Sequence, residues 1–85
     1  PVPLDTTAVT RELLANRFRV LAVAAMVLRE HHLADDVFQQ VVMKAIENPA
    51  QFKDAGHLLA WALRTARHRA IDAARGRREQ RLDEG

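Results

Sequence analysis

Alanine and leucine residues recur at helical spacing through the C-terminal part of the chain. At about 100° per residue, one side of a helix over residues 58–78 collects these apolar positions: Leu59, Ala62, Leu63, Ala66, Ala70, Ala73 and Ala74. Because alanine carries only a methyl group, such a face lets a second helix approach closely. The stripe predicts a long helix, from about Leu58 to about Arg78, packed against other helices.

Two earlier segments also have helical periodicity. The first predicted helix extends from about Thr7 to about Arg29, with Asp5, Thr6 and Thr7 as N-cap candidates and a core stripe of Leu14, Phe18, Leu21, Ala25 and Leu28. The second extends from about Asp35 to about Glu47, with a core face of Val37, Phe38, Val41, Val42, Ala45 and Ile46. Its acidic pair, Asp35 and Asp36, is expected in the first turn, where the helix dipole favours negative charge.

The connections between these segments are short. The polar run EHHLAD joins the first two helices, and NPAQFKDAGH joins the second and third, where Pro49 disfavours helix at Asn48 and Gly56 permits a turn. Strand alternation and hairpin signals are absent from the sequence. We therefore expect an all-α fold, a compact bundle of three main helices with room for a short extra helix or turn in a connection.

Length and composition bound the organisation of the chain. The 85 residues suffice for one small domain, expected over residues 7–78, between an N-terminal tail (1–6) and a C-terminal segment (79–85) that frays or starts a linker. Cysteine is absent, which excludes disulfides and thiolate metal sites. No apolar run approaches the roughly 20 residues that span a bilayer, and no signal peptide is visible, so we expect a cytoplasmic protein.

Positive charge is concentrated on the third predicted helix. The formal net charge is +2, but between residues 64 and 78 six arginines oppose only Asp72, which leaves +5. The side of the helix opposite the alanine stripe carries Arg64, Arg67, His68, Asp72, Arg75 and Arg78. This density predicts a polyanionic partner, and nucleic acid is favoured over an anionic membrane.

Trp61 falls on the same side as these arginines, and two interpretations of it stay open. Its ring could stack on bases of single-stranded nucleic acid while the arginines neutralise phosphates. Alternatively, the ring packs under the NPAQF segment and completes the core.

Other function classes have weaker support. The run HHLADD gathers His31, His32, Asp35 and Asp36, but adjacent histidines point apart on a helix and no further metal ligand is obviously placed. Serine is absent and no nucleophile–base pair stands out, so we expect no enzyme activity, metal or cofactor. A generic helical DNA-binding or protein-interaction domain of a transcription regulator remains a competing hypothesis, with the basic helix in a major groove.

Two runs in fixed order carry a family resemblance. ADDVFQQVVMKAIENPAQF followed by LLAWALRTARHRAID resembles the second conserved region of bacterial RNA polymerase sigma factors, closest to the extracytoplasmic-function branch. The resemblance covers about Glu12 to Arg78. It implies a domain that binds core RNA polymerase and recognises and melts the minus-ten promoter element, with an anti-sigma factor as a further partner. It also implies that residues 79–85 are the start of a linker to a missing C-terminal domain.

The resemblance also assigns roles to residues. The second helix of such proteins docks on the clamp coiled coil of the largest polymerase subunit through a D-x-x-Q motif, here Asp36 and Gln39. The same helix face carries Gln40, Met43 and Glu47. The loop over residues 48–57 would help capture a base flipped from the non-template strand, and the implied DNA-binding set is Phe52, Lys53, His57, Trp61, Arg64, Arg67, His68, Arg75 and Arg78.

The chain departs from the family pattern at several of these positions. Gln40 replaces the usual acid after Gln39, and Val42 stands where the family often has Phe. His68 replaces an Asn, so it can donate or accept only through its ring nitrogens. The loop lacks the usual Arg-Gly-Asp-like run. The promoter sequence and the affinity for polymerase are therefore left open.

Overall fold

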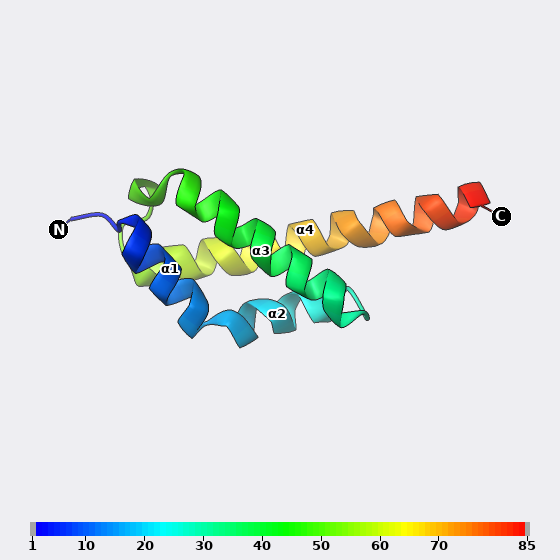
Figure 1. Cartoon of the computed structure of the whole chain (residues 1–85), viewed down its shortest axis with the longest axis horizontal. Helices are drawn as coiled ribbons and strands as arrows, with labels where there is room; N and C mark the ends of the chain where they lie inside the picture. Colours follow the sequence, from blue (N-terminus) through cyan, green and yellow to red (C-terminus); the bar gives the residue numbers. More distant parts are fainter. Residues whose placement is uncertain (1, 85) are drawn as a thin grey trace.

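The computed structural model describes residues 2–84, with the side chains of residues 2–80 and of Leu82. Over this range the chain forms only helices, which confirms the all-α class. Four α-helices and one 3-10 turn follow one another in the order α1 (Thr6–Ala15), α2 (Arg17–Ala25), α3 (His31–Glu47), η1 (Pro49–Gln51) and α4 (Ala55–Glu84) (Figure 1).

The prediction of a single helix from Thr7 to Arg29 is wrong, because the helix is interrupted at Asn16. Asp5 caps α1 as expected, since its Oδ1 accepts the Ala8 N–H at 2.8 Å. At the other end, Asn16 Nδ2 donates to the Glu12 carbonyl at 2.9 Å, and the Asn16 backbone leaves helical geometry. An asparagine side chain competes with the helical ladder in this way, and here it ends α1 and lets the chain bend into α2.

The core face of α1 and α2 also differs from the prediction. The buried side chains of this segment are Val9, Leu13, Val20, Ala24 and Leu28. Of the predicted stripe only Leu28 is buried, whereas Leu14 and Ala25 are exposed and Phe18 is 80% exposed. On a continuous helix Arg11 and Arg29 lie within about 20° of Phe18, so burying that stripe would also have buried two guanidinium groups.

Helix α3 begins four residues earlier than predicted. It starts at His31, so Asp35 and Asp36 lie in the second turn and no acidic residue occupies the first. Its buried side chains are Ala34, Val37, Phe38, Val41 and Ala45, which confirms most of the predicted core face. Val42 is half-buried and Ile46 is exposed, because both lie at the edge of that face.

Helix α4 is longer than predicted at both ends. It begins at Ala55, and Asp54 Oδ1 accepts the His57 N–H at 2.8 Å in the manner of an N-cap. Gly56 therefore lies in the first turn of the helix and does not form the expected turn. At the other end α4 continues through Gly76 and past Arg78 to Glu84.

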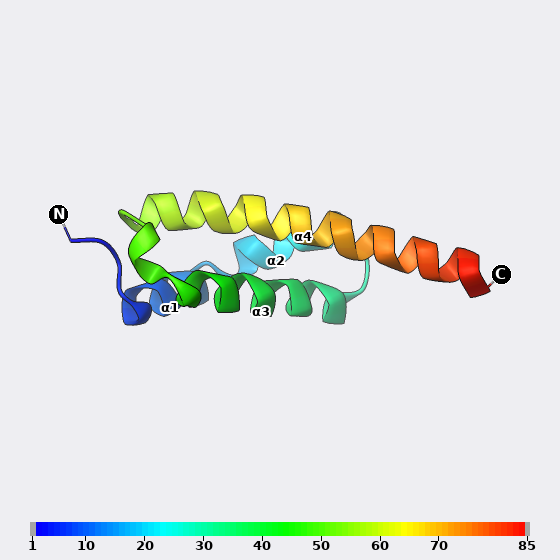
Figure 2. The same cartoon turned by 90° about the horizontal axis from the view of Figure 1, so that it is seen from above.

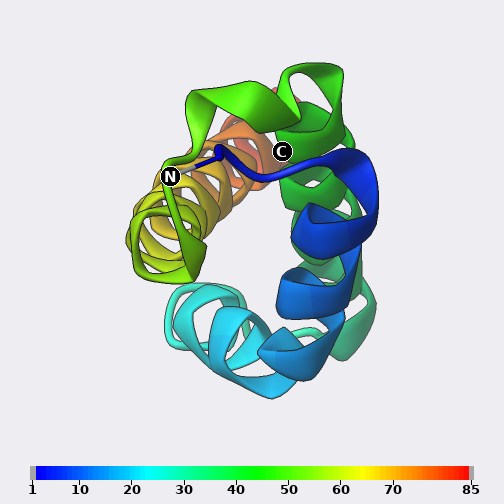
Figure 3. The ribbon, with the colours of Figure 1, turned by 90° about the vertical axis from the view of Figure 1, so that its left-hand side faces the viewer.

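The helices pack around the alanine face of α4. Leu58, Ala62, Ala66 and Ala70 are fully buried, while Leu59, Leu63, Ala73 and Ala74 are half-buried at its sides. Helix α3 runs alongside α4 (Figure 2), and α1 and α2 close the bundle (Figure 3). The last turns of α4 project beyond the other helices. None of the helices described here is both long and apolar enough to cross a bilayer.

Candidate functional site

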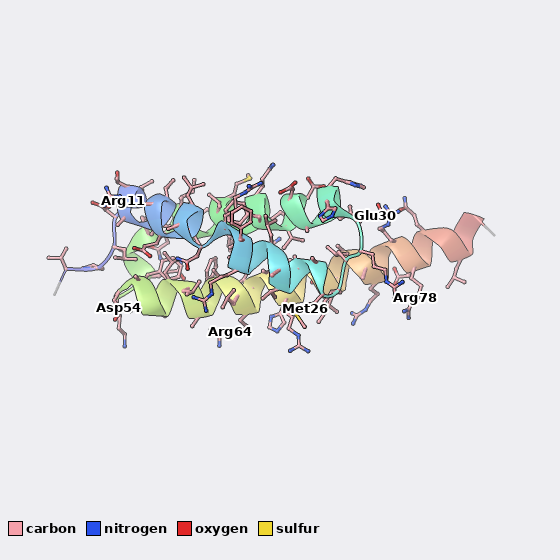
Figure 4. The ribbon with its side chains drawn as sticks, turned by 90° about the horizontal axis from the view of Figure 1, so that it is seen from below. Arg11, Met26, Glu30, Asp54, Arg64 and Arg78 are labelled. Carbon is pink, nitrogen blue, oxygen red and sulfur yellow. The ribbon has the colours of Figure 1, made fainter. Side chains whose placement is uncertain are left out.

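Four arginines and a histidine form an exposed strip along α4. This basic strip consists of Arg64, Arg67, His68, Arg75 and Arg78, all on the side away from the buried alanines. Arg64 and Arg78 both point out of the bundle (Figure 4). None of the four arginines takes part in an ion pair within the described part of the chain. Their guanidinium groups are therefore available to an external anion.

The two remaining arginines of the segment contact other parts of the bundle. Arg69 Nη1 donates to Gln40 Oε1 on α3 at 3.2 Å. Arg77 Nη2 donates to Glu30 Oε1, in the connection between α2 and α3, at 3.1 Å. The basic segment is therefore not uniform, because its arginines divide into a solvent-facing group and a group that links α4 to the rest of the bundle.

Trp61 lies at the end of the strip and is half-buried. Its ring meets the Phe52 ring edge-on, with centroids 5.0 Å apart and planes at 63°. Phe52 also contacts the His57 ring at 5.6 Å. The interpretation that the ring packs on the NPAQF segment is therefore confirmed for the part of the ring that meets Phe52. The rest of its surface is accessible, and stacking on bases stays a prediction.

Phe52 itself is 0% exposed, so the prediction that it contacts DNA directly is wrong for this structure. Its backbone is tied down as well, because its carbonyl accepts the Leu4 N–H at 3.1 Å and its N–H donates to the Pro49 carbonyl at 3.2 Å. A buried ring of this kind positions its neighbours and cannot stack on a base.

Lys53 and His57, the other two predicted loop residues, are exposed. The Lys53 N–H donates to His57 Nδ1 at 3.2 Å, so Nδ1 acts as an acceptor and the ring proton belongs on Nε2. Nε2 therefore remains to donate to a ligand, while the rest of the imidazole is held by the start of α4.

The outer face of α3 carries the other predicted set. Asp36, Gln39, Gln40, Met43 and Glu47, called here the α3 face, are all exposed on the side away from the valine core. Met43 is 64% exposed, a large apolar area for a surface side chain. Glu47 pairs with Lys44 at 3.2 Å.

Asp36 and its neighbour Asp35 differ in their ion pairing. Asp35 pairs with Arg17 on α2 at 3.1 Å, and the same guanidinium lies 5.8 Å from the centre of the Phe38 ring. Asp36 has no ion-pair partner among the described residues. The carboxylate of Asp35 is thus engaged within the bundle, whereas that of Asp36 is free to meet a partner.

A groove connects the α3 face to α4. Gln40, Met43, Lys44 and Glu47 line it on one side and Arg69 on the other, with a volume of about 190 Å³. Arg69 was missed by sequence reasoning, because its contact with Gln40 joins residues 29 positions apart. Among the residues described, no group of three or more His, Asp and Glu side chains is placed to hold a metal ion.

Comparison with known protein families gives a match over most of the chain. The family model for Sigma-70 region 2 matches residues 13–80, which is 68 of the 85 residues. The match begins at the buried Leu13 in α1 and includes the α3 face, the loop and the whole basic strip. Searches for similar curated proteins and for similar solved structures returned no match.

Proposed function

This chain belongs to the sigma-70 region 2 family, and from that premise we propose that it recognises and melts the minus-ten promoter element while bound to core RNA polymerase. Domains of this family belong to transcription initiation factors and not to a catalytic family. The observation that carries the proposal is the exposed, unpaired basic strip on α4 within the matched region. We place the protein in the extracytoplasmic-function branch, acting in the cytoplasm, with an anti-sigma factor as a further partner.

The α3 face is the proposed contact with the clamp coiled coil of the largest polymerase subunit. Asp36 and Gln39 are exposed one turn apart, and among the described residues neither side chain takes part in a hydrogen bond or an ion pair. Met43, one turn beyond Gln39, offers an apolar side chain that a partner helix would cover. Gln40 is already held by Arg69, so it contributes less than the acid that the family usually has there.

The basic strip and Trp61 are the proposed contact with the opened non-template strand. Extruding a base from a duplex costs a few kcal/mol. Stacking on an aromatic ring returns about 1–3 kcal/mol per base, and phosphate contacts hold the separated strand. Melting by this route needs a surface that binds unpaired bases better than paired ones, and it needs no covalent chemistry from the domain.

The polymerase contact is tested by titrating the domain with a clamp coiled-coil fragment. Asp36→Ala and Gln39→Ala should each weaken binding without changing the helix content measured by circular dichroism. Asp72→Ala, which removes one exposed carboxylate from α4, is the matched control and should bind like the wild type. Equal affinity of all four proteins would exclude the α3 face as the docking surface.

The DNA contact is tested by comparing binding to a minus-ten non-template oligonucleotide with binding to the matching duplex. The wild type should prefer the single strand, and Arg64→Ala should lower affinity for both, more at low salt than at high salt. Arg11→Ala, which removes an exposed arginine of α1 on the other side of the bundle from Arg64, is the control (Figure 4). Tight duplex binding without any clamp binding would instead favour the generic DNA-binding domain, with α4 as a major-groove helix.

A further inference from the structure

A pocket lies where the connection between α2 and α3 meets α4. Its volume is about 330 Å³, and its apolar floor includes Leu28 and Leu33. Three arginines and one acid line the rest, namely Arg29, Arg77, Arg78 and Glu30. Glu30 and Arg78 lie near the same end of the bundle, far from Asp54 in the loop before α4 (Figure 4). The pocket is thus separate from that loop, where Phe52 packs on Trp61.

The charges around this pocket do not cancel. Three guanidinium groups and one carboxylate leave a net charge of +2. Glu30 Oε1 already accepts Arg77 at 3.1 Å, and its Oε2 lies 3.4 Å from His32 Nε2. Arg29 and Arg78 have no ion-pair partner in the described structure, and both are exposed. An anion entering the pocket would relieve the repulsion between these like charges.

The residue types favour a phosphate group as that anion. Guanidinium groups bind phosphate through two parallel hydrogen bonds, and Arg is the usual residue where such planar recognition matters. Arg78 belongs both to the pocket and to the basic strip. A DNA strand bound along the strip would therefore reach the pocket at the C-terminal end of the strip. Arg29 adds a cation from a segment that the basic run on α4 does not include.

We propose that this pocket binds a backbone phosphate of promoter DNA, and that Glu30 competes with this phosphate for Arg77. The proposal rests on the function proposed above. Arg29 and Arg78 contact the phosphate directly. Arg77 is shared, because the guanidinium that would complete the site is bound to Glu30 in this structure. Glu30 therefore weakens DNA binding, and its removal strengthens it.

Phosphate contacts carry no sequence information, so the test can use a labelled oligonucleotide of mixed sequence. Fluorescence anisotropy over a series of salt concentrations measures affinity and its salt dependence. Losing one single-strand phosphate contact lowers the slope of log K against log salt by about 0.7, which is roughly fivefold in affinity at about 0.1 M salt. Arg29→Ala should show both changes, and the control Arg11→Ala should show neither.

Glu30→Gln should change the oligonucleotide affinity in the opposite direction to Arg29→Ala. The amide keeps the shape of the side chain but removes the charge that holds Arg77, so the guanidinium turns more readily to phosphate. Affinity should rise by up to about fivefold, and the salt slope should steepen by up to about 0.7. The same substitution in an Arg77→Ala background should have no effect. Circular dichroism of each variant checks that helix content is unchanged. A merely structural Glu30–Arg77 pair would make Glu30→Gln neutral or harmful to binding.

The possible outcomes separate this inference from the proposed function. If the wild type binds the oligonucleotide but Arg29→Ala and Glu30→Gln behave like Arg11→Ala, the pocket proposal is wrong and the proposed function stands. If the wild type binds no DNA, both are wrong. If Arg29→Ala weakens binding to the clamp fragment or to vesicles containing phosphatidylglycerol, and leaves oligonucleotide binding unchanged, the anion belongs to a protein or a lipid and the proposal is overturned.

Discussion

Replacing Trp61 separates its two roles, because the ring is half-buried against Phe52 and partly open to solvent. Trp61→Ala removes both the packing and the stacking surface. Trp61→Phe keeps an aromatic ring that can still meet Phe52. We therefore expect the alanine variant to lose stability and single-strand affinity together, and the phenylalanine variant to keep most of both.

The expected loss of stability follows from the packing. Truncating a fully buried Trp to Ala costs about 3–5 kcal/mol, so a half-buried ring corresponds to roughly 2 kcal/mol. Losing the edge-on contact with Phe52 adds about 0.5–1 kcal/mol. A total of about 2–3 kcal/mol corresponds to a fall in Tm of roughly 10–20 °C for a domain of this size. Trp61→Phe should lose about 1 kcal/mol or less.

Trp61 is the only tryptophan, so its fluorescence cannot report on the variants, and urea unfolding is followed by circular dichroism. Binding is then measured at low temperature, where Trp61→Ala remains folded. Loss of one stacked base should reduce single-strand affinity by about 1–3 kcal/mol, roughly 5- to 150-fold, with little change in duplex affinity.

Two results would contradict this reasoning. If Trp61→Ala loses less than about 0.5 kcal/mol of stability, the ring does not pack on Phe52 as described. If folded Trp61→Ala retains the wild-type preference for single strands, the ring has no part in DNA binding, and the accessible part of its surface is incidental.

Three further predictions concern the structure of α4. Ala66→Leu, which forces a larger side chain between closely packed helices, should cost about 1–3 kcal/mol or more in urea unfolding, whereas the same substitution at the exposed Ala60 should cost little. Gly76→Ala should stabilise α4 by up to about 1 kcal/mol and raise helix content, because a Cβ at this position meets nothing within 4 Å; a loss of stability would show that α4 is not helical there. Asp54→Ala should cost about 1 kcal/mol through loss of the cap on the His57 N–H, and unchanged stability would mean that the cap contributes nothing.

The helical class and most of the core faces of α3 and α4 could be predicted because they depend on local periodicity. The alanine spacing on α4 allows only one core face, because the opposite side of the helix carries many arginines. The first helix had two apolar stripes, one through Leu13 and Val20 and another through Leu14 and Phe18. Periodicity alone does not choose between them, and the break at Asn16 depends on a side-chain hydrogen bond that the pattern of apolar residues does not reveal.

The candidate site likewise contains some residues that could be predicted from the sequence and others that could not. The exposure of Asp36, Gln39 and the basic strip was predictable, because each is the reverse side of a helix whose core face is apolar. Their roles toward polymerase and DNA came from the family resemblance and stay predictions. Phe52 was misassigned, because a residue in a short connection has no periodicity that shows whether it faces inward.

By itself, the sequence determined which segments are helical and placed a dense positive charge opposite a face of small residues on the last helix. Both properties depend on residues within a few turns of one another. Only the tertiary structure decided which arginines are available to a ligand. Arg69 and Arg77 are held by Gln40 and Glu30, which lie 29 and 47 positions away in the chain. Contacts over such separations exist only once the helices have packed together. That packing places the arginines of one basic segment in three different settings, namely the basic strip, the groove and the pocket.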